Sequence, residues 1–373
     1  MSLRPDAWTR AALGPPRAHG APLPKAQIKA EPEDFRVEEQ LSFVPSGKGP
    51  HWLLRVEKRA ANTRWVAAEL ARLAGLPPAE VGYAGLKDRH AITVQWFSVP
   101  AGKKSQEFWR EVRSDEFRVL EAHANQRKLK RGALSGNRFR IRLRNVAWSP
   151  DALEAKLAAL RAHGAPNYFG PQRFGREGGN LDRVADWLEG GVKPTGRTER
   201  GFALSAARSL IFNAVLARRV ESASWGLLQP GDLASLDGSG SHFRVEAVDD
   251  ELSRRVEGFD IHPSGPLWGR GAPQTEGAVR ELELETAREF SAVAEFLAAE
   301  GLEQERRPLR CAVRDLCVEA DGGVGPNAGA GAEAGTLTLA FSLGRGQFAT
   351  AVLREIADLG DALEPGAYQA DAD

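Results

Sequence analysis

The feature that most constrains this 373-residue sequence is a basic stretch at positions 127–144, RKLKRGALSGNRFRIRLR. It contains eight basic residues and no acidic one. In its second half every other residue is an arginine, and the residues between them are Phe139, Ile141 and Leu143. Strict alternation of charged and apolar residues predicts a β-strand with one solvated and one buried face. The arginines on the solvated face are Arg138, Arg140, Arg142 and Arg144.

Such a row of like charges is costly without an anion nearby, because successive arginines stand only about 6.6 Å apart, roughly twice the rise per strand residue. Phosphates along a nucleic-acid strand are spaced on a similar scale, so the row can follow an RNA or DNA backbone. The alternative is an edge strand that its charges protect from aggregation. We favour nucleic-acid contact because repulsion within the row weighs against that alternative. The residues expected to contact the backbone are Arg127, Lys128, Lys130, Arg131, Arg138, Arg140, Arg142 and Arg144.

The distribution of charge along the chain agrees with a polyanionic partner. The sequence has 50 basic and 50 acidic residues, so its formal net charge is zero. Residues 1–150 contain 27 Lys and Arg and 15 Asp and Glu, a net charge of +12, which leaves −12 for residues 151–373. A basic N-terminal part on a neutral chain suggests a polyanion. Accidental clustering of charges on solvated faces is the alternative, and charge alone does not decide between the two.

Several classes of protein are not indicated. The longest run without a charged residue has 13 residues, at 90–102, which is shorter than the roughly 18 apolar residues that a membrane-spanning helix needs. The first residues contain no apolar segment of a secretion signal. The two cysteines, Cys311 and Cys317, and the seven scattered histidines supply neither a disulfide framework nor the ligand spacing of a metal site. We therefore expect a cytoplasmic protein with no membrane segment and no metal.

Periodicity and capping residues predict a mixture of helices and strands. Residues 62–74 carry a helical apolar stripe, with Asn62 or Thr63 as the N-cap and Gly75 at the end. The other predicted helices begin at Ser149-Pro150 or span 205–220, 281–302 and 348–359. The predicted extended segments are 28–44 (with a turn at 31–34), 92–99, 138–144 and 336–343, whereas 1–27 is expected to be irregular and 321–335 to be a flexible loop. This mixture favours an α+β fold with a mixed or antiparallel sheet.

One cluster of reactive side chains lies at 81–99, VGYAGLKDRHAITVQWFSV. Asp88 is flanked by Lys87, Arg89 and His90, and neighbouring cations favour the ionised form of a carboxyl group. Such a carboxylate can act as a nucleophile, a base or an electrostatic stabiliser. For a Lys-Asp-Arg triplet taken alone, a surface ion-pair cluster is the commoner explanation. The motifs of small-molecule enzymes, such as a Walker A loop, G-x-G-x-x-G, H-E-x-x-H or G-x-S-x-G, do not occur.

The segment GYAGLKDRHAITVQWFSV at 82–99 resembles the catalytic motif of the TruD family of tRNA pseudouridine synthases. Other stretches resemble the family in the same order along the chain: IKAEPEDFRVEE at 28–39, HWLLRVEKRAANTRWVA at 51–67, RKLKRGALSGNRFRIRLR at 127–144, NYFGPQRFGREGGNL at 167–181, LSAARSLIFNAVLA at 204–217, HPSGPLWG at 262–269 and FATAVLRE at 348–355. The resemblance covers roughly residues 25–360. Several long, independent motifs at family spacing are far more specific than one short pattern.

The resemblance implies an α+β fold with two parts. One is a pseudouridine-synthase catalytic domain, in which helices flank a mixed or antiparallel sheet, and the other is an inserted α+β domain. We expect residues 1–162 and 311–373 to form the catalytic domain and residues 163–310 to form the inserted one. The stretch at 167–181 carries Arg173 and Arg176 among glycines, and it is either an anion-binding loop or a hinge into the second domain.

The resemblance also implies a reaction and the residues that perform it. Family members convert a tRNA uridine to pseudouridine, typically at position 13 in the D-arm, with one essential aspartate and no cofactor. That aspartate corresponds to Asp88, which can attack the ribose, attack the base or remove a ribose proton. Substrate-contacting positions of the family correspond to Phe35, Asn137, Phe139 and Phe348, and further pocket candidates are Lys29, Glu33 and Lys87. We expect tRNA as the partner, and a monomer without an obligate protein partner.

Elementary chemistry fits these roles. The target base has to leave its stack, and stacking on an aromatic ring offsets part of that cost, roughly 1–3 kcal/mol per base. Phe139 faces away from the arginines, beside Asn137, so it can cover the uracil while Asn137 donates to and accepts from the edge of the base. Core packing is the alternative for the phenylalanines, and only the resemblance favours substrate contact. A non-catalytic RNA-binding module is the alternative to an enzyme of this family, and a small-molecule enzyme is a distant third.

Overall fold

The chain forms two compact units, which the computed structural model describes over residues 5–191, 194, 196–319 and 335–359. The sheet unit contains the described residues of the segments 24–149 and 314–346. The helical unit contains those of the segments 1–23, 150–313 and 347–366. Each unit has a hydrophobic core of its own.

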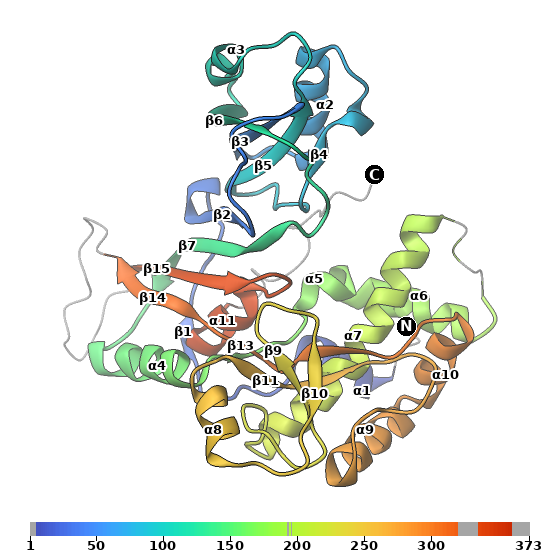
Figure 1. Ribbon diagram of the computed structural model, residues 1–373. Coiled ribbons are helices and arrows are strands. Elements are labelled where there is room, and N and C mark those ends of the chain that lie inside the picture. The colour runs from blue at the N-terminus through green and yellow to red at the C-terminus, as the bar shows by residue number, and fades with distance from the viewer. Residues whose placement is uncertain (1–4, 192–193, 195, 320–334, 360–373) are drawn as a thin grey trace. The chain divides into compact units, whose positions relative to one another are not determined.

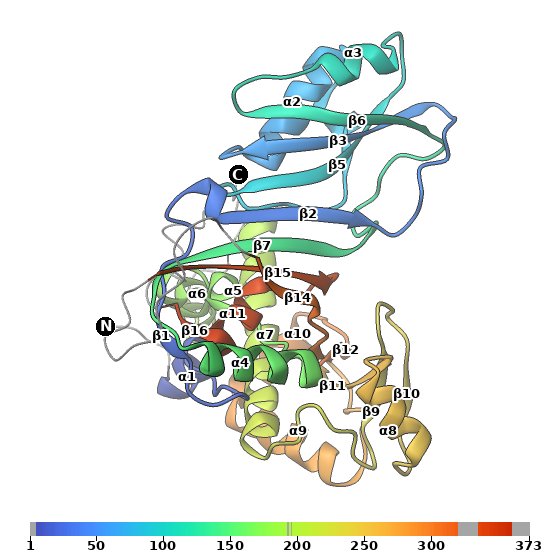
Figure 2. The same cartoon turned by 90° about the vertical axis from the view of Figure 1, so that its left-hand side faces the viewer.

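A mixed sheet of eight strands forms the sheet unit. Its strands are β2 (Phe35–Leu41), β3 (His51–Arg59), β4 (Gly82–Tyr83), β5 (Ile92–Pro100), β6 (Phe117–Asn125), β7 (Leu134–Val146), β14 (Arg314–Glu319) and β15 (Gly335–Gly344). Figure 2 shows the order β14-β15-β7-β2-β5-β3-β6 across the sheet, and β4 pairs with β5. Strands β2 and β5 run parallel, whereas the other described neighbours are antiparallel. The expected α+β fold with a mixed sheet is therefore confirmed.

Strand β7 carries the arginine row and lies in the interior of the sheet, between β15 and β2. Its burial alternates as the sequence predicts, because Phe139, Ile141 and Leu143 are buried while the arginines between them lie on the opposite face. The edge-strand alternative is wrong, because β7 has a hydrogen-bonded neighbour on each side.

Helix α2 (Thr63–Ala74) covers one face of this sheet at the strands β3 and β5. Of the two predicted N-caps, Asn62 and Thr63, it is Asn62 that caps the helix, and its side-chain oxygen accepts a hydrogen bond from the backbone N–H of Arg64. Gly75 ends the helix in the left-handed conformation, with φ of 72°. Val66 and Leu70 are fully buried on the inner face of the helix. The remaining short helices of the unit are η1 (Pro32–Asp34), η2 (Pro78–Glu80) and α3 (Gln106–Glu111).

The helical unit is built around α7 (Arg197–Glu221), which contacts α1, α6, α9, α10 and β11 (Figure 1). The other helices are α1 (Asp6–Leu13), α4 (Pro150–His163), α5 (Pro171–Phe174), η3 (Arg176–Gly178), α6 (Gly179–Leu188), α8 (Asp250–Glu257), α9 (Gly277–Glu289), α10 (Ser291–Ala299) and α11 (Ala349–Ile356). The small strands are β8 (Ala165–Pro166), β9 (Leu233–Leu236), β10 (His242–Arg244), β11 (Ile261–Leu267), β12 (Glu305–Pro308) and β13 (Arg310–Cys311). Strands β10, β9, β11 and β12 form one antiparallel sheet in that order, and β13 pairs with β8. The remaining short strands are β1 (Leu23–Lys25) and β16 (Ala357–Asp358).

The core of the helical unit surrounds the middle of α7. The consecutive residues Leu210, Ile211 and Phe212 are all fully buried, so this part of the helix is covered on several sides rather than along one stripe. Among the described helices, none has the length and the apolar composition that crossing a membrane requires.

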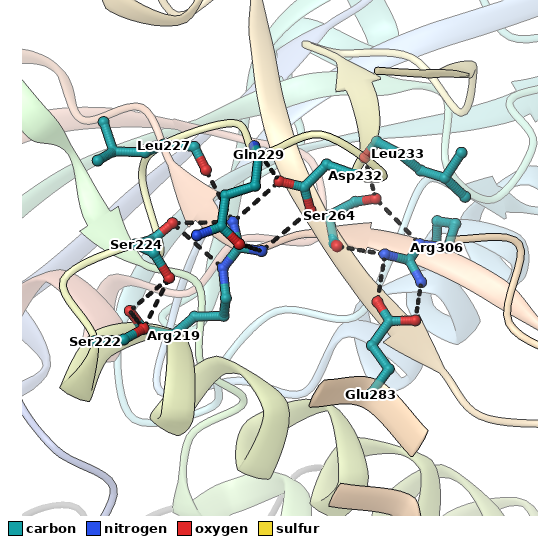
Figure 3. A network of polar contacts seen from close by, with 10 residues as sticks. All are labelled: Arg219, Ser222, Ser224, Leu227, Gln229, Asp232, Leu233, Ser264, Glu283 and Arg306. Atoms are coloured by element: carbon teal, nitrogen blue, oxygen red, sulfur yellow. Dashed lines mark hydrogen bonds and ion pairs between the residues drawn. The ribbon is translucent and has the colours of Figure 1, made fainter. Parts of the chain in front are cut away.

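Buried charges at the end of α7 are paired with one another (Figure 3). The guanidinium of Arg219 donates to both carboxylate oxygens of Asp232, each at 3.1 Å, and to the backbone carbonyl of Ser224. Nearby, the guanidinium of Arg306 donates to the two carboxylate oxygens of Glu283 at 2.8 and 3.1 Å. These bonds avoid the large cost of an uncompensated buried charge. The first pair ties the end of α7 to the loop before β9, and the second ties β12 to α9.

Three local predictions differ from the structure. Residues 1–27 are not irregular throughout, because α1 forms and buries Trp8 in the helical core. The single helix predicted at 281–302 is divided into α9 and α10 at Phe290, whose backbone leaves the helical region with ψ of 33° while its ring is buried. Helix α8, capped by Asp249, was not predicted. Residues 321–334 of the expected flexible loop lie outside the described residues.

The compact units divide the chain differently from the expected domains, 1–162 with 311–373 and 163–310. Helices α4 and α11 belong to the helical unit, because α11 packs against α4 and β8. The segment before residue 24 also belongs to that unit, through α1. Compactness does not test which segments carry out catalysis, so the domain assignment stays a prediction.

Candidate active site

The carboxylate of Asp88 lies beside a buried lysine in the sheet unit. Asp88 belongs to the loop between β4 and β5, and its side chain is 37% exposed. Its Oδ2 atom lies 3.3 Å from Nζ of Lys29, whose side chain is only 2% exposed. Lys29 has a φ of 56°, a conformation that is uncommon for residues with a side chain and that occurs often at functional sites. An accessible acid next to a buried cation marks this pair as the candidate active site.

Burial sets the charge state of Lys29. Its Nζ atom lies 4.0 Å from the centroid of the Phe35 ring, which is itself buried. Removal from water disfavours the ammonium form and lowers the pKa of Lys29 to about 8, although the Asp88 carboxylate opposes this shift. Lys29 therefore changes charge near physiological pH, directly beside the candidate catalytic acid.

A second lysine holds the backbone of Asp88. The fully buried Nζ of Lys58 donates to the carbonyl oxygen of Asp88 at 2.8 Å and to that of Ala61 at 2.6 Å. Sequence reasoning did not single out Lys58. The sequence feature that could have identified Lys58 is its position in β3. Buried and more exposed residues alternate there, and Lys58 shares the buried face with Leu54 and Val56.

The start of α2 and strand β5 hold the rest of the loop. The hydroxyl of Thr63 accepts a hydrogen bond from the backbone N–H of Lys87 at 3.1 Å and donates to the Oε1 atom of Gln95 at 2.9 Å. The amide of Gln95 donates in turn to the carbonyl oxygen of Gly85 at 3.2 Å. Thr63 and Gln95 are fully buried, and neither was identified from the sequence as part of the site. The loop that carries Asp88 is thus fixed by side chains from three elements.

The side chain of Lys87 faces a buried carboxyl group. Its Nζ atom lies 3.8 Å from Oε1 of Glu39, and Glu39 also accepts a hydrogen bond from the backbone N–H of Trp96 at 3.2 Å. Burial raises the pKa of Glu39, and the ammonium of Lys87 opposes that shift. Lys87 therefore has an internal partner in Glu39, a residue that the sequence prediction did not include.

The predicted aromatic residues of the sheet unit form one buried cluster. The rings of Phe35 and Phe139 meet edge to face, with centroids 6.3 Å apart. Phe139 stacks on Phe341 of β15, with centroids 5.4 Å apart. Because all three rings are buried, they provide both a packed core and a rigid support for Lys29, which lies on Phe35.

Asn137 lies on the same face of β7 as Phe139, two residues earlier in the strand. Its Oδ1 atom is buried, and no described group donates a hydrogen bond to it. A buried amide oxygen without a donor is uncommon in native proteins. The structure therefore places an available acceptor beside the aromatic cluster, and its contact with the edge of a uracil stays a prediction.

The arginine row of β7 has carboxylate partners inside the protein. Arg144 donates to both oxygens of the buried Asp34 at 2.8 to 3.0 Å, and Arg142 lies 3.7 Å from the same carboxylate. Arg140 pairs with Glu319 of β14 at 2.5 Å. Arg138 is exposed and forms no ion pair with a described residue. The anions that the row requires are therefore partly internal, and contact with RNA stays a prediction, best supported for Arg138.

The other predicted residues are spread over both units. Glu33 accepts a hydrogen bond from Arg59 at 2.7 Å, which lowers the pKa of Glu33, and this pair is separate from the contacts of Asp88. Lys128 donates to the carbonyl oxygen of Ala79 at 2.8 Å. The exposed basic residues of the preceding loop are Arg127, Lys130 and Arg131. Phe348 belongs to the helical unit, where its ring lies 6.0 Å from that of Phe169.

Within the described part of the chain, no group of three or more His, Cys, Asp and Glu side chains is arranged to hold a metal ion. The carboxylate of Asp88 is of a kind that can act as a nucleophile or a base.

Three comparisons relate the chain to known proteins. A family model described as tRNA pseudouridine synthase D (TruD) matches residues 21–192 and 197–356. A protein named tRNA pseudouridine synthase D from Methylococcus capsulatus is 46% identical over 92% of this chain and 94% of its own length. A protein of the same name from Nitrosococcus oceani is 46% identical over 90% of this chain and 91% of its own. A crystal structure assigned to tRNA pseudouridine synthase D from Methanosarcina mazei shares the fold, with a TM-score of 0.70 at 20% identity over 94% of this chain and 97% of the other.

Proposed function

Since this chain belongs to the TruD family of tRNA pseudouridine synthases, we propose that it converts uridine 13 in the D-arm of tRNA to pseudouridine, with Asp88 as the essential carboxylate. Family membership makes the chain an isomerase that acts on tRNA. One observation carries the assignment of Asp88. Its carboxylate is accessible from solvent and is paired at 3.3 Å with the buried Lys29.

The reaction itself explains why one carboxylate is sufficient. The C1′–N1 bond of uridine breaks, a C1′–C5 bond forms, and the proton lost from C5 is balanced by a proton gained at N1. No electrons are exchanged with another reagent, so the conversion needs no redox cofactor. A carboxylate can begin it by attacking C1′, by attacking C6 of the base or by removing the proton from C2′. Asp88 is suited to each of these steps because its carboxylate is exposed while its backbone is held by Lys58.

The face of the sheet next to Asp88 offers contacts for an extruded base. The Oδ1 atom of Asn137 is an acceptor for N3–H of uracil, because it is buried and has no donor among the described residues. Phe35 and Phe139 form a buried aromatic support on the same face, and a base stacks on either ring only if this cluster opens to admit it. Such stacking contributes roughly 1–3 kcal/mol per base, which offsets part of the cost of unstacking.

The decisive experiment replaces the acid of Asp88. We expect Asp88→Asn and Asp88→Ala to bind an unmodified tRNA transcript as the wild type does, while pseudouridine formation falls by roughly 1,000-fold or more. Tritium release from C5-labelled uridine measures the reaction, and filter binding measures the affinity. Asp115→Asn is the matched control, because Asp115 is an exposed aspartate elsewhere in the sheet unit. Turnover close to that of the wild type in both Asp88 variants would remove Asp88 from this role.

The same assay tests the substrate position and the enzyme itself. A transcript that carries cytidine at position 13 should release no tritium, whereas release at an unchanged rate would contradict the proposed position. A wild-type protein that binds tRNA and produces no pseudouridine would favour the alternative of an RNA-binding module.

We further propose that tRNA is the partner of a cytoplasmic monomer without an obligate protein partner. Light scattering of the purified chain should give a mass near 40.4 kDa. A mass of twice that value at micromolar concentration would contradict the monomer.

A further inference from the structure

Four loops of the sheet unit meet at the end of the sheet where β2, β5, β6 and β15 finish (Figure 2). Strand pairing brings the loops together, because Pro100 and Asn125 both lie opposite His51, and Leu134 lies opposite Leu41. Strand β15 ends beside the start of β7. The four loops, which we call the loop surface, are 42–50, 101–105, 126–133 and 345–346.

Hydrogen bonds join the loops to one another. The side-chain oxygen of Asn125 accepts from the backbone N–H of Ser46 at 3.1 Å, and its amide donates to the carbonyl oxygen of Arg127 at 2.8 Å. The backbone N–H of Ala101 donates to the carbonyl oxygen of Pro50 at 2.8 Å. The fold therefore fixes the backbones from which the exposed side chains of the loop surface project.

The loop surface is strongly basic. Its loops contain eight Lys and Arg residues and no Asp or Glu: Lys48, Lys103, Lys104, Arg127, Lys128, Lys130, Arg131 and Arg345. Lys48, Lys103 and Arg345 are exposed, and none of the three forms an ion pair with a described residue. Arg345 also donates to the carbonyl oxygen of Gly132 at 3.1 Å, which holds the last loop against the third. This excess of one charge favours a polyanion as the partner.

Two apolar side chains are exposed in the same loop as Lys48. Val44 is 88% exposed, and Phe43 is 39% exposed. Single apolar residues on a surface are common, but this adjacent pair includes an aromatic ring within a basic surface. Proteins that bind unpaired RNA combine aromatic rings, on which bases stack, with basic side chains that hold phosphates. Protein interfaces are instead depleted of lysine, so the composition of the loop surface favours RNA.

The loop surface is remote from Asp88. Asp88 precedes β5, and its carbonyl oxygen is bound by Lys58, which lies opposite Thr93 near the start of that strand. The loop 101–105 follows the other end of β5, at Pro100. Eight steps of about 3.3 Å separate the two ends of this strand, or roughly 26 Å. A nucleotide on the loop surface is therefore different from the one that reacts at Asp88.

We propose that the loop surface binds an unpaired nucleotide of the tRNA, with the base on Phe43 and Val44 and the flanking phosphates on basic side chains of the four loops. The proposal rests on the proposed function, because the tRNA is the substrate named there. It extends that function by a contact outside the stretch 127–144, which the sequence singled out. Every base has a π face, so this contact adds affinity without reading the sequence of the RNA.

The first test removes the aromatic ring and keeps an apolar side chain. We expect Phe43→Leu to weaken binding of an unmodified tRNA transcript by at least about fivefold, as the loss of one stacked base implies. Phe43→Tyr should bind like the wild type, because the ring is kept. Trp65→Leu is the matched control, since Trp65 is a 41% exposed aromatic residue on α2 of the same unit. Unchanged affinity in Phe43→Leu would overturn the proposal.

The second test removes single charges. Lys48→Gln and Lys103→Gln should each reduce the slope of log affinity against log salt by about 0.7, the value for one phosphate of a single strand. Phe43→Leu should leave the slope unchanged, because it removes no charge. Arg72→Gln is the matched control, since Arg72 is exposed in the same unit and pairs with Glu69 at 2.8 Å. Wild-type slopes in both lysine variants would contradict the phosphate contacts.

Further measurements separate RNA contact from other roles of the apolar pair. Ultraviolet cross-linking should join the segment 42–50 to a nucleotide of the tRNA other than uridine 13, and a cross-link to uridine 13 would contradict the proposal. The melting temperature of Phe43→Leu should equal that of the wild type. A lower melting temperature with unchanged affinity would assign a structural role to the ring. A wild-type dimer that Phe43→Leu dissociates, again with unchanged affinity, would assign the surface to a second copy of the chain.

The outcome is separable from that of the proposed function. Binding is measured without turnover, so Phe43→Leu can be combined with Asp88→Asn, and the same loss of affinity is expected. If the wild type formed no pseudouridine while Phe43→Leu still weakened tRNA binding, the loop surface would stand and the proposed reaction would fail. Normal turnover with unchanged affinity in Phe43→Leu would remove the loop surface and leave the reaction intact.

Discussion

A buried lysine, Lys29, lies within ion-pair distance of the Asp88 carboxylate. The ammonium of Lys29 is almost completely buried, and Phe35 is its aromatic neighbour. Burial favours the neutral amine, whereas the carboxylate of Asp88 favours the ammonium. The balance leaves the pKa of Lys29 at about 8, so a modest rise in pH removes the positive charge next to the candidate catalytic acid.

This balance predicts a pH dependence of the reaction. Turnover should fall as the pH rises through about 8, because Lys29 then loses the ammonium that faces Asp88. Lys29→Arg should remain active at pH 9, since a guanidinium keeps its charge. Lys29→Met should be slower by roughly 100-fold below pH 8, a typical loss for one electrostatic group, and the difference should narrow at higher pH because the wild type then loses the same charge. A wild-type rate that is constant from pH 7 to 9.5 would contradict this role for Lys29.

The free energy of unfolding should change with pH in the opposite direction to the turnover. The pKa of Lys29 falls from 10.5 to about 8 on folding, so the folded state holds fewer protons than the unfolded state between these values. Stability therefore rises as the pH increases through this window, and below pH 8 the buried ammonium costs roughly 3 kcal/mol. Lys29→Met should unfold at higher urea concentration than the wild type at pH 7, because Asp88 is exposed enough to be hydrated on its own.

Strand β7 shows how one element serves packing and charge at once. Its apolar residues enter the core, while Arg140 and Arg144 bind carboxylates of β14 and of the turn before β2. The groove beside this face is about 180 Å³ in volume and is lined by Glu38 and Glu319 as well as by Arg138. The face is therefore a set of ion pairs across strands, with Arg138 left available to a phosphate.

Two arginines of β7 should consequently respond differently to substitution. Arg138→Gln should lower the salt dependence of tRNA binding by about 0.7 to 0.9 and leave stability unchanged. Arg144→Gln should leave that slope unchanged and reduce the free energy of unfolding by roughly 2 kcal/mol, because the buried Asp34 would lose its bidentate partner and keep Arg142 at 3.7 Å. Filter binding and urea denaturation measure the two effects. If both variants lowered the salt slope by the same amount, the whole row would contact RNA and this prediction would be wrong.

At the scale of the whole molecule, each unit has its own hydrophobic core and its own buried polar network. In the helical unit, the pair Arg219 and Asp232 is almost completely inaccessible to solvent. In the sheet unit, Lys58, Thr63 and Gln95 hold the loop of Asp88. A substitution in one network should therefore destabilise its own unit first.

The pair in the helical unit offers a direct test. Arg219→Leu should destabilise the helical unit by about 3–5 kcal/mol, because Asp232 would be left as an uncompensated buried charge. Amide hydrogen exchange should become faster in α7 and stay unchanged in β5. The double variant Arg219→Leu with Asp232→Leu should recover part of the loss, since no charge then remains buried. Equal acceleration of exchange in both units would contradict their independent stability.

The local sequence was sufficient to predict elements whose pattern is set by neighbouring residues. Helix α2, with its cap at Asn62 and its end at Gly75, and strand β7 with its alternating faces follow from such patterns. The stretch around Asp88 was recognised because its motif is contiguous in the chain. Only tertiary structure decided which charges meet, because Arg144 and Asp34 are 110 residues apart, and Arg140 and Glu319 are 179 residues apart. The same reason hid Lys58, since its burial and its hydrogen bond to the backbone of Asp88 depend on segments that no local pattern connects.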